Sequence, residues 1–264
     1  MRAPIFQLDA FTTKRFRGNP AAVVALPEFP TDHAMRAIAA ENNLSETAFI
    51  VAEGGDYRIR WFTPTVEVPL CGHATLASAA VVMERIEPER RSVVFHSASG
   101  PLTVRRTPAG YAMDFPARPS QPCAVPALVI EALAAEPEDM RASEFNYLAV
   151  LGSEPQLRRL TPDMGAISAL DRPGLIVTAR GAPPYDFTSR YFAPAKGIPE
   201  DPVTGGAHCM LAPYWAERLG KSDFRAYQAS ARGGEMFCRL QRDRVELEGA
   251  CVFYLEGEAQ LDGA

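Results

Sequence analysis

The sequence predicts an α+β protein of two similar halves, each combining several strands with one buried helix. Two stretches, from Ala74 to about Met83 and from Ala207 to about Leu219, are expected to form apolar helices, and the first is apolar on every side. A helix of that kind is normally buried. Each stretch follows a strand, a short loop and a turn that contains glycine.

The residues around the two helices echo each other, which is the second observation behind this prediction. The first half has Phe62-Thr63-Pro64 and then Cys71-Gly72-His73-Ala74; the second has Phe192-Ala193-Pro194 and then Thr204-Gly205-Gly206-Ala207. Chance similarity between two alanine-rich helices is the alternative. We interpret the echo as a duplicated domain whose two helix N-termini enclose one small pocket.

The remaining elements follow from alternation and turn residues. In the first half we expect a helix from Asp32 to about Asn42 and strands at 5–11, 21–26, 46–51, 57–62, 66–70, 93–95, 102–106 and 111–115. In the second half we expect a helix at 125–135 and strands at 147–151, 175–179, 186–193, 224–229, 236–240 and 245–255. Three prolines in the seven residues 116–122 place the domain boundary there, giving domains 1–117 and 118–264. The last strand can cross back to the first domain.

Composition excludes several classes of function. The net charge of −5 argues against binding to nucleic acid or to an anionic membrane surface. No apolar run reaches the length of a membrane span, and the N-terminus has no signal-peptide pattern, so we expect a cytoplasmic protein. Five irregularly spaced cysteines are typical of reduced thiols. The common metal and nucleotide motifs are absent, so we expect no cofactor and no metal.

Two features of the first half carry candidate chemistry. Cys71, Gly72 and His73 form the first turn of the apolar helix, where backbone N–H groups and the helix dipole favour a carboxylate. Glu46 begins an apolar strand, where an acid is unusual. Burial would make that carboxylate a stronger base, as the removal of a proton from carbon requires. A core helix with an ordinary glycine turn, and a glutamate pointing to solvent, are the alternatives.

Four motifs in order resemble the PhzF-like isomerase family of phenazine biosynthesis. They are F-x-G-N-P-A-A-V-V from Phe16, N-L-S-E-T-A-F from Asn43, F-T-P-x-x-E-V-x-L-C-G-H-A-T-L-A from Phe62 and E-D-P-V-T-G-x-A-H from Glu200. The resemblance implies a diaminopimelate epimerase-like fold, with two pseudo-symmetric domains that each wrap a mixed sheet around a central helix. It also implies an active site in the interdomain cleft, a homodimer and no cofactor.

The family's functional residues carry over to positions of this sequence. The catalytic glutamate falls on Glu46, the histidine on His73 and the aspartate on Asp201. The same motifs suggest a substrate-binding set: Asn19, Cys71, Gly72, Thr204, Gly205 and Gly206. Gly206 stands where the family often has serine. The stretch 228–234 resembles the broad branch of the family more than the phenazine enzyme itself.

These observations predict a cofactor-independent isomerase of a small carboxylate, in which Glu46 transfers a proton at carbon. An amino-acid racemase or epimerase that uses Cys71 is the enzymatic alternative. The second helix start offers Asp201 and no second cysteine, which argues against a two-thiol epimerase. A catalytically silent small-molecule binding protein is the alternative from another class.

Overall fold

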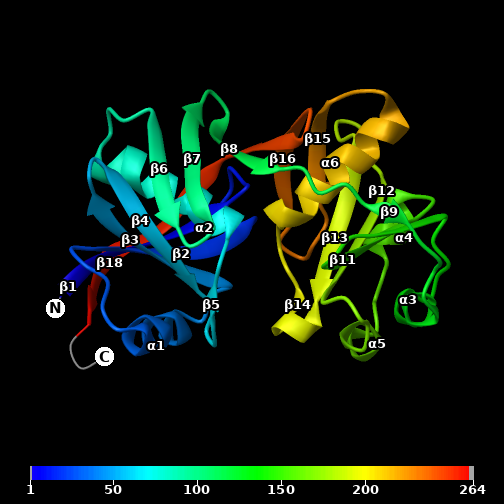
Figure 1. The fold of residues 1–264 in the computed structure, drawn as a ribbon, viewed down its shortest axis with the longest axis horizontal. Coiled ribbons are helices and arrows are strands. Elements are labelled where there is room, and N and C mark those ends of the chain that lie inside the picture. The colour runs from blue at the N-terminus through cyan, green and yellow to red at the C-terminus, as the bar shows by residue number, and fades with distance from the viewer. Residues whose placement is uncertain (1, 262–264) are drawn as a thin grey trace. The chain divides into compact units, whose positions relative to one another are not determined.

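The computed structural model describes residues 2–261, which form two compact units (Figure 1). The first unit contains the chain up to Asp114 and again from Glu248 onward, and the second spans Phe115–Leu247. The chain therefore enters the second unit within β8 (Gly110–Pro116) and leaves it within β17 (Arg244–Gly249). Among the described residues, no helix is both long and apolar enough to cross a membrane.

The first unit is a mixed sheet with one helix buried against it. Its strands run in the order β18, β1, β2, β3, β4, β6, β7, β8, and the short β5 pairs with the end of β4. Their bounds are β1 (Arg2–Ala10), β2 (Asn19–Leu26), β3 (Glu46–Glu53), β4 (Asp56–Phe62), β5 (Glu67–Val68), β6 (Ser92–Ser97), β7 (Gly100–Thr107) and β18 (Cys251–Gln260). The helices are α1 (Asp32–Asn42) and α2 (Gly72–Val81), and α2 continues as a π-helical turn, η1 (Val82–Ile86).

The second unit has the strand order β9, β10, β11, β12, β13, β15, β16, with the short β14 paired to the end of β13. The bounds are β9 (Gln121–Pro122), β10 (Asp139–Ala142), β11 (Asn146–Val150), β12 (Gly174–Arg180), β13 (Phe187–Ala193), β14 (Ile198–Glu200), β15 (Asp223–Gln228) and β16 (Gly234–Gln241). Helices α3 (Ala127–Leu133), α4 (Glu154–Arg158), α5 (Met164–Ser168), η2 (Pro194–Lys196) and α6 (Gly205–Leu219) complete it. The single strand expected at 245–255 is in fact two strands, β17 and β18, with a break at Ala250.

The two units repeat one topology. In the first, β2 and β3 are parallel, β3 and β4 antiparallel, β4 and β6 parallel, and β6 and β7 antiparallel. In the second, β11, β12, β13, β15 and β16 pair in the same sequence of directions. In both, the central helix lies in the chain between the two parallel strands β4 and β6 or β13 and β15. The echo read from the sequence is therefore a structural repeat.

An ion pair fixes the alignment of the two repeats residue by residue. Phe62 is opposite Glu67 in the β4–β5 pair, and Phe192 is opposite Glu200 in the β13–β14 pair. Two residues before each phenylalanine, an arginine forms a bidentate pair with that glutamate: Arg60 at 2.7 and 2.6 Å, and Arg190 at 2.7 and 2.9 Å. Phe62 and Phe192 are therefore equivalent positions.

Helix α2 is buried along its whole length after Gly72. Its contacts with β1, β2, β3 and β18 come from the strands of its own unit. Two polar residues are tolerated inside because each hydroxyl bonds to a carbonyl of the helix itself: Thr75 Oγ1 donates to the Cys71 carbonyl at 2.5 Å, and Ser78 Oγ to the Ala74 carbonyl at 2.7 Å. The helix begins two residues earlier than the sequence suggested, so that Gly72 and His73 lie in its first turn.

Helix α6 is the counterpart of α2 in the second unit, and Figure 1 shows each helix beside the strands of its own unit. Trp215 stacks on Phe187 of β13, with ring centroids 5.7 Å apart, and its Nε1 donates to Thr178 Oγ1 at 3.1 Å. The helix ends at Gly220, whose φ of 64° is a left-handed conformation that glycine adopts without steric cost.

Candidate active site

The start of α2 brings together four residues that the sequence singled out. Glu46 is the first residue of β3, Asn19 the first of β2, and Cys71 and His73 flank Gly72 at the helix N-terminus. The Glu46 and His73 side chains are 12% and 6% exposed, and Glu46 Oε2 lies 3.3 Å from His73 Nε2. These two atoms do not form a hydrogen bond with each other, so the contact is a close polar one.

The imidazole of His73 is held neutral and oriented. Burial lowers the pKa of His73 to about 4, against the weaker opposing effect of the Pro20 carbonyl. Asn19 Nδ2 lies 3.2 Å from Nδ1, and Asn19 is completely buried. The other ring nitrogen, Nε2, faces Glu46. At neutral pH the Glu46–His73 contact is thus not an ion pair.

Cys71 approaches the other side of the same ring. Its Sγ lies 3.5 Å from His73 Nδ1, and the residue is buried. Among the described residues, Glu46, Cys71 and His73 are the group whose ligand atoms, all within 4.8 Å of one another, could hold a metal ion. Because the carboxylate and the thiol face opposite ring nitrogens, the arrangement is better suited to holding or relaying a proton than to sharing one ion.

The N-terminus of α2 is not capped by a side chain. Helix α1 begins with Thr31, whose Oγ1 accepts from the Ala34 amide at 3.2 Å, and α4 and α5 are capped by Ser153 and Asp163. Cys71 makes no such bond at the start of α2. A buried helix start without a side-chain cap directs backbone N–H groups and the positive end of the dipole at the space beside Glu46 and His73, which favours an anion there.

The start of α6 carries the site residues expected in the second half. The N-cap is Thr204, whose hydroxyl makes no cap bond and instead donates to the Asp201 carboxylate. Gln228 of β15 joins the two: its Oε1 accepts from the Thr204 amide at 2.9 Å, and its Nε2 donates to the Asp201 carbonyl at 2.7 Å. Gln228 is 1% exposed, so the loop before α6 is fixed from within its unit.

Gly205 and Gly206 differ in their surroundings. Gly205 is buried, and a Cβ there would lie 3.4 Å from the Leu247 side chain. Gly206 is exposed, with open space where its Cβ would be. Because Cys71 and Thr204 are the two N-cap residues, Gly206 is the position equivalent to His73. The second helix start therefore lacks the imidazole of the first.

His208 lies inside α6 and is packed against its own unit. It is fully buried, its ring lies 5.9 Å from that of Phe187, and its Nδ1 is 2.8 Å from the Thr204 carbonyl. Burial lowers the pKa of His208 to about 4, with the Thr204 carbonyl opposing this. It is a neutral structural histidine at physiological pH.

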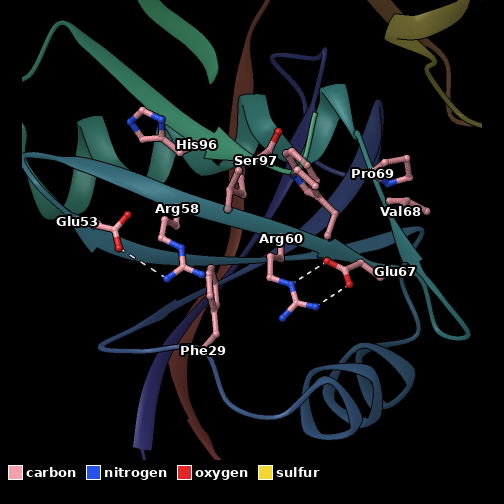
Figure 2. A pocket seen from close by; sticks show the side chains of 12 residues that line it. Phe29, Glu53, Arg58, Arg60, Glu67, Val68, Pro69, His96 and Ser97 are labelled. Carbon is pink, nitrogen blue, oxygen red and sulfur yellow. Dashed lines mark hydrogen bonds and ion pairs between the residues drawn. The ribbon is translucent and has the colours of Figure 1, made fainter. Parts of the chain in front are cut away.

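A separate hollow of about 340 Å³ lies in the first unit, along β4 (Figure 2). None of the four residues at the start of α2 lines it. Its cations are paired: Arg58 with Glu53 at 3.6 Å, and Arg60 with Glu67, while the Phe29 ring lies 4.9 Å from the Arg58 guanidinium. This balance of charge leaves little attraction for an anionic ligand.

Sequence reasoning missed Gln228, although a signal was present. In the strand at 224–229 the buried positions alternate, and a glutamine at one of them needs internal partners.

The chain is similar in sequence to known proteins over nearly its whole length. Residues 8–257 match the family described as phenazine biosynthesis-like protein. An uncharacterized isomerase of Pseudomonas aeruginosa is 47% identical over 99% of this chain and 100% of its own length. The mouse phenazine biosynthesis-like domain-containing protein 1 is 43% identical over 97% of this chain and 99% of its own.

Solved structures confirm the predicted fold class. A phenazine biosynthesis protein of the PhzF family from Enterococcus faecalis is 41% identical and superposes with a TM-score of 0.95, covering 98% of this chain and 100% of its own. A hydroxyproline epimerase from Agrobacterium vitis is similar with a TM-score of 0.63 at 11% identity, covering 98% and 91%. The second likeness concerns the fold alone, which is α+β and diaminopimelate epimerase-like.

Proposed function

This chain belongs to the phenazine biosynthesis-like protein family, and we propose that it is an isomerase that moves a proton between carbon atoms of a small carboxylate without a cofactor. Relatives that are 45–47% identical over their full length are named isomerases. The observation that carries the proposal is the contact of Glu46 with a neutral His73 beside the uncapped start of α2.

Glu46 is the proton carrier in this proposal. Its carboxylate takes a proton from a carbon adjacent to an unsaturated or carbonyl-bearing group, and the electron pair delocalises as an enolate or dienolate. The same carboxyl group then returns the proton to another carbon, so that the double bond moves and no atoms are gained or lost. A carboxylate that is 12% exposed is shielded from most water, as the removal of a proton from carbon requires.

The backbone at the start of α2 stabilises the charge. Negative charge that develops on the substrate needs donors already in place, and the first-turn N–H groups from Gly72 onward provide them. His73 is neutral, and its Nε2 lies 3.3 Å from Glu46 Oε2, where the ring holds the carboxylate in position. Asn19 fixes that imidazole from its other nitrogen.

The second unit contributes binding groups in the same proposal. Thr204, Gly205 and Gly206 present a second helix start without a side-chain cap, and Asp201 accepts the Thr204 hydroxyl. We assign Asp201 to the reaction on the family resemblance. A homodimer and a cytoplasmic location belong to the same set of proposals, and sedimentation equilibrium of the purified chain measures the first.

One observation favours a second function. Cys71 Sγ lies 3.5 Å from His73 Nδ1, an arrangement in which an imidazole can take a proton from a thiol. A thiol racemase of the two-base kind would need a second cysteine at the other helix start, where Thr204 stands. An epimerase built on this site would therefore need Cys71 and a carboxylate as its two catalytic groups.

The test is solvent deuterium incorporation at carbon. The wild-type protein is incubated in deuterated water with a panel of small unsaturated and amino acids, and products are read by NMR and mass spectrometry. Glu46→Gln keeps the shape of the side chain but removes the base, so turnover falls by about 10²–10⁴-fold. Glu67→Gln, which removes a carboxylate bonded to Arg60 in the same unit, is the matched control and keeps turnover. A Glu46→Gln protein that retains wild-type turnover would sink the proposal.

A further inference from the structure

The alignment of the two repeats extends to the strands that follow the central helices. The registers of β6 on β4 and of β15 on β13 make Phe95 equivalent to Ala226. Two positions further along these strands are Ser97 in the first unit and Gln228 in the second. A short side chain therefore stands in the first unit where the second has a long carboxamide.

A repeated hydrogen bond supports this register. Ser99 Oγ donates to the Pro69 carbonyl at 2.7 Å, and Ser230 Oγ donates to the Pro202 carbonyl at 2.8 Å. Each serine lies just after β6 or β15, and each proline lies in the loop before the central helix. The same two segments are thus joined at the same point in both units.

Gln228 and Ser97 differ in what they do at this junction. The Gln228 carboxamide joins two points of the loop before α6, the Thr204 amide and the Asp201 carbonyl. In the repeat, Val68 corresponds to Asp201. Ser97 Oγ instead donates at 2.8 Å to a carbonyl of its own turn. Ser97 and Val68 both line the hollow along β4 (Figure 2), so the hollow lies where the second unit has its carboxamide.

The backbone ladder is also shorter beside the hollow. In the second unit, the Ser189 carbonyl of β13 accepts from the Ala229 amide at 2.7 Å. The counterparts in the first unit are Ile59 and Ala98, and over residues 2–261 no such bond joins them, because β6 leaves β4 one residue sooner. Ile59 and Ala98 both line the hollow. The Ile59 carbonyl is therefore an acceptor that a ligand in the hollow can use.

Trp61 supplies a buried donor at the same place. It lines the hollow and is 1% exposed, and its Nε1 has no hydrogen-bond partner within the described part of the chain. Its counterpart Tyr191 donates to Asn146 Oδ1 at 3.1 Å and lies where a side chain at Gly174 would be. Gly174 is itself the counterpart of Glu46, because each precedes the strand partner of the repeated phenylalanine by one residue. A buried N–H without an acceptor is unfavourable, so an acceptor in the hollow would stabilise it.

The size and charge of the hollow restrict what it can bind. Its volume of about 340 Å³ is within the range of small-molecule sites. Arg58 and Arg60 are already paired with Glu53 and Glu67, which favours a neutral ligand over an anion. A primary carboxamide is neutral and offers one acceptor and two donors, which complements an indole N–H and a backbone carbonyl.

We propose that the hollow along β4 binds a small neutral molecule that carries a primary carboxamide, in the place that Gln228 takes in the second unit. The ligand carbonyl accepts from Trp61 Nε1, and the ligand NH₂ donates to the Ile59 carbonyl. A ligand bound there also packs against Val68 and Pro69, and so holds the loop before α2. The proposal does not rest on the proposed function, since it uses no residue of the candidate active site.

The two tryptophans of the chain, Trp61 and Trp215, give a test with an internal reference. The intact protein, with its tryptophans labelled with heavy nitrogen, is titrated with benzamide, and Trp61→Phe and Trp215→Phe assign the two indole N–H signals in the NMR spectrum. The Trp61 signal should move downfield and saturate, with a dissociation constant of about 0.1–1 mM. Trp215 already donates to Thr178 Oγ1, so its signal should stay in place. No saturable shift of the Trp61 signal up to about 10 mM benzamide overturns the proposal.

Two analogues of benzamide test the carboxamide itself. Benzoate has the same shape but replaces the NH₂ donors with a negative charge, and N,N-dimethylbenzamide keeps the carbonyl and has no donor. Each should bind at least about tenfold more weakly than benzamide, as the loss of a hydrogen bond at a buried site predicts. Equal binding of all three compounds would show that the hollow recognises only the aromatic ring, and the assignment would be wrong.

A variant that carries the carboxamide covalently tests the equivalence with Gln228. Ser97→Gln should weaken benzamide at least about tenfold by filling the hollow. Ser92→Gln, an exposed position of the same strand outside the hollow, is the matched control and should bind as wild type does. Trp61→Phe removes the donor alone and should weaken benzamide at least about threefold in saturation-transfer NMR. Wild-type affinity in Trp61→Phe, or in a Ser97→Gln protein that is folded by circular dichroism, contradicts the proposal.

Two further measurements locate the ligand. Benzamide should slow amide hydrogen exchange about threefold or more in the loop before α2 and leave the loop before α6, which Gln228 already holds, unchanged. Glu46→Gln should bind benzamide as wild type does, whether or not its turnover is lost. Loss of binding in Glu46→Gln would place the ligand at the candidate active site and overturn the assignment to the hollow.

Discussion

The starts of α2 and α6 share one architecture and differ in chemistry. Both helices follow a strand and a short paired strand, both are buried, and both begin without a side-chain cap. At the first, Glu46 and His73 lie 3.3 Å apart. At the second, the equivalent positions are Gly174 and Gly206, and the Asn146 amide oxygen and the Tyr191 phenol occupy the space that a side chain at Gly174 would need.

The difference shows how a duplicated unit can divide a task. The shared topology gives each half a helix N-terminus whose backbone N–H groups favour an anion. Side chains at two equivalent positions then decide what each half does with it. The first half has a base and an oriented imidazole, and the second has a loop fixed by Gln228. We expect proton transfer from the first and binding from the second.

Among the variants that test this comparison, the largest loss of turnover is expected for His73→Gln. His73→Gln removes the imidazole that orients Glu46, while the glutamine amide can still meet Asn19. Turnover should fall by roughly 10–10²-fold, mainly in kcat, because positioning a general base is worth less than the base itself. Gly206→Ala at the equivalent position, where space is open, should change kcat little. A larger loss of kcat in Gly206→Ala than in His73→Gln would reverse the roles of the two starts.

Acid should destabilise both halves in the same way. Burial lowers the pKa of His73 and of His208 from 6.5 to about 4. The unfolded chain therefore binds these protons at a higher pH than the folded chain does. The neutral buried histidines make their full contribution to the free energy of unfolding above about pH 6.5. As the pH falls towards 4, the free energy of unfolding should decrease by up to about 1.4 kcal/mol per pH unit for each histidine.

Urea unfolding between pH 4 and pH 7 measures this. His73→Asn and His208→Asn should each reduce the slope, and His96→Asn, whose side chain is 52% exposed, serves as the control. Equal slopes in wild type and both buried variants would mean that these histidines titrate alike in the folded and unfolded chains.

The arginine–glutamate ion pair that occurs in both units allows a direct comparison of stability between them. Arg190 is 11% exposed and also donates to the Leu160 carbonyl at 2.7 Å, whereas Arg60 is 25% exposed. Arg190→Met leaves a poorly hydrated Glu200 and should lower the free energy of unfolding by roughly 2–4 kcal/mol. Arg60→Met should cost about 1 kcal/mol or less. Thermal and urea unfolding of the two variants give both values, and an equal cost would show that burial does not distinguish the repeats.

The smallest effect is expected at Cys71. Cys71→Ala removes the thiol near His73 Nδ1 but leaves Asn19 to orient the ring. The deuterium assay should show turnover within about threefold of wild type, because the proposed reaction uses no thiol. Loss of turnover in Cys71→Ala together with an active Glu46→Gln would instead assign the protein to the thiol epimerases.

The sequence carried enough to predict the architecture because its signals were long or repeated. The apolar stretches of α2 and α6 and the echo around Phe62 and Phe192 predicted the duplicated fold, which the structure and its relatives confirm. Short elements were missed. Helices α4 and α5 have five residues each, too few to show a helical period. Ser153 with Gln156 three residues later was still a capping signature that we did not use.

The candidate site was predictable only where its residues lie in motifs close in the chain. Cys71 and His73 were visible as the first turn of a buried helix, and Glu46 as an acid in an apolar strand. Gln228 joins the second helix start through its contact with Thr204, which is 24 positions away in the chain. Such contacts depend on strand register, which local patterns do not specify.

The pairing of β1 with β18 has a consequence for the nascent chain. β1 pairs with β18 along its whole length, from Ala10 with Cys251 to Arg2 with Gln260. This pairing cannot form until almost the whole chain has been synthesised. Residues 115–247 emerge earlier as one uninterrupted unit. The second unit can thus close first. The half that we expect to carry out the proton transfer is the last to be completed, although most of its residues are the first to be made.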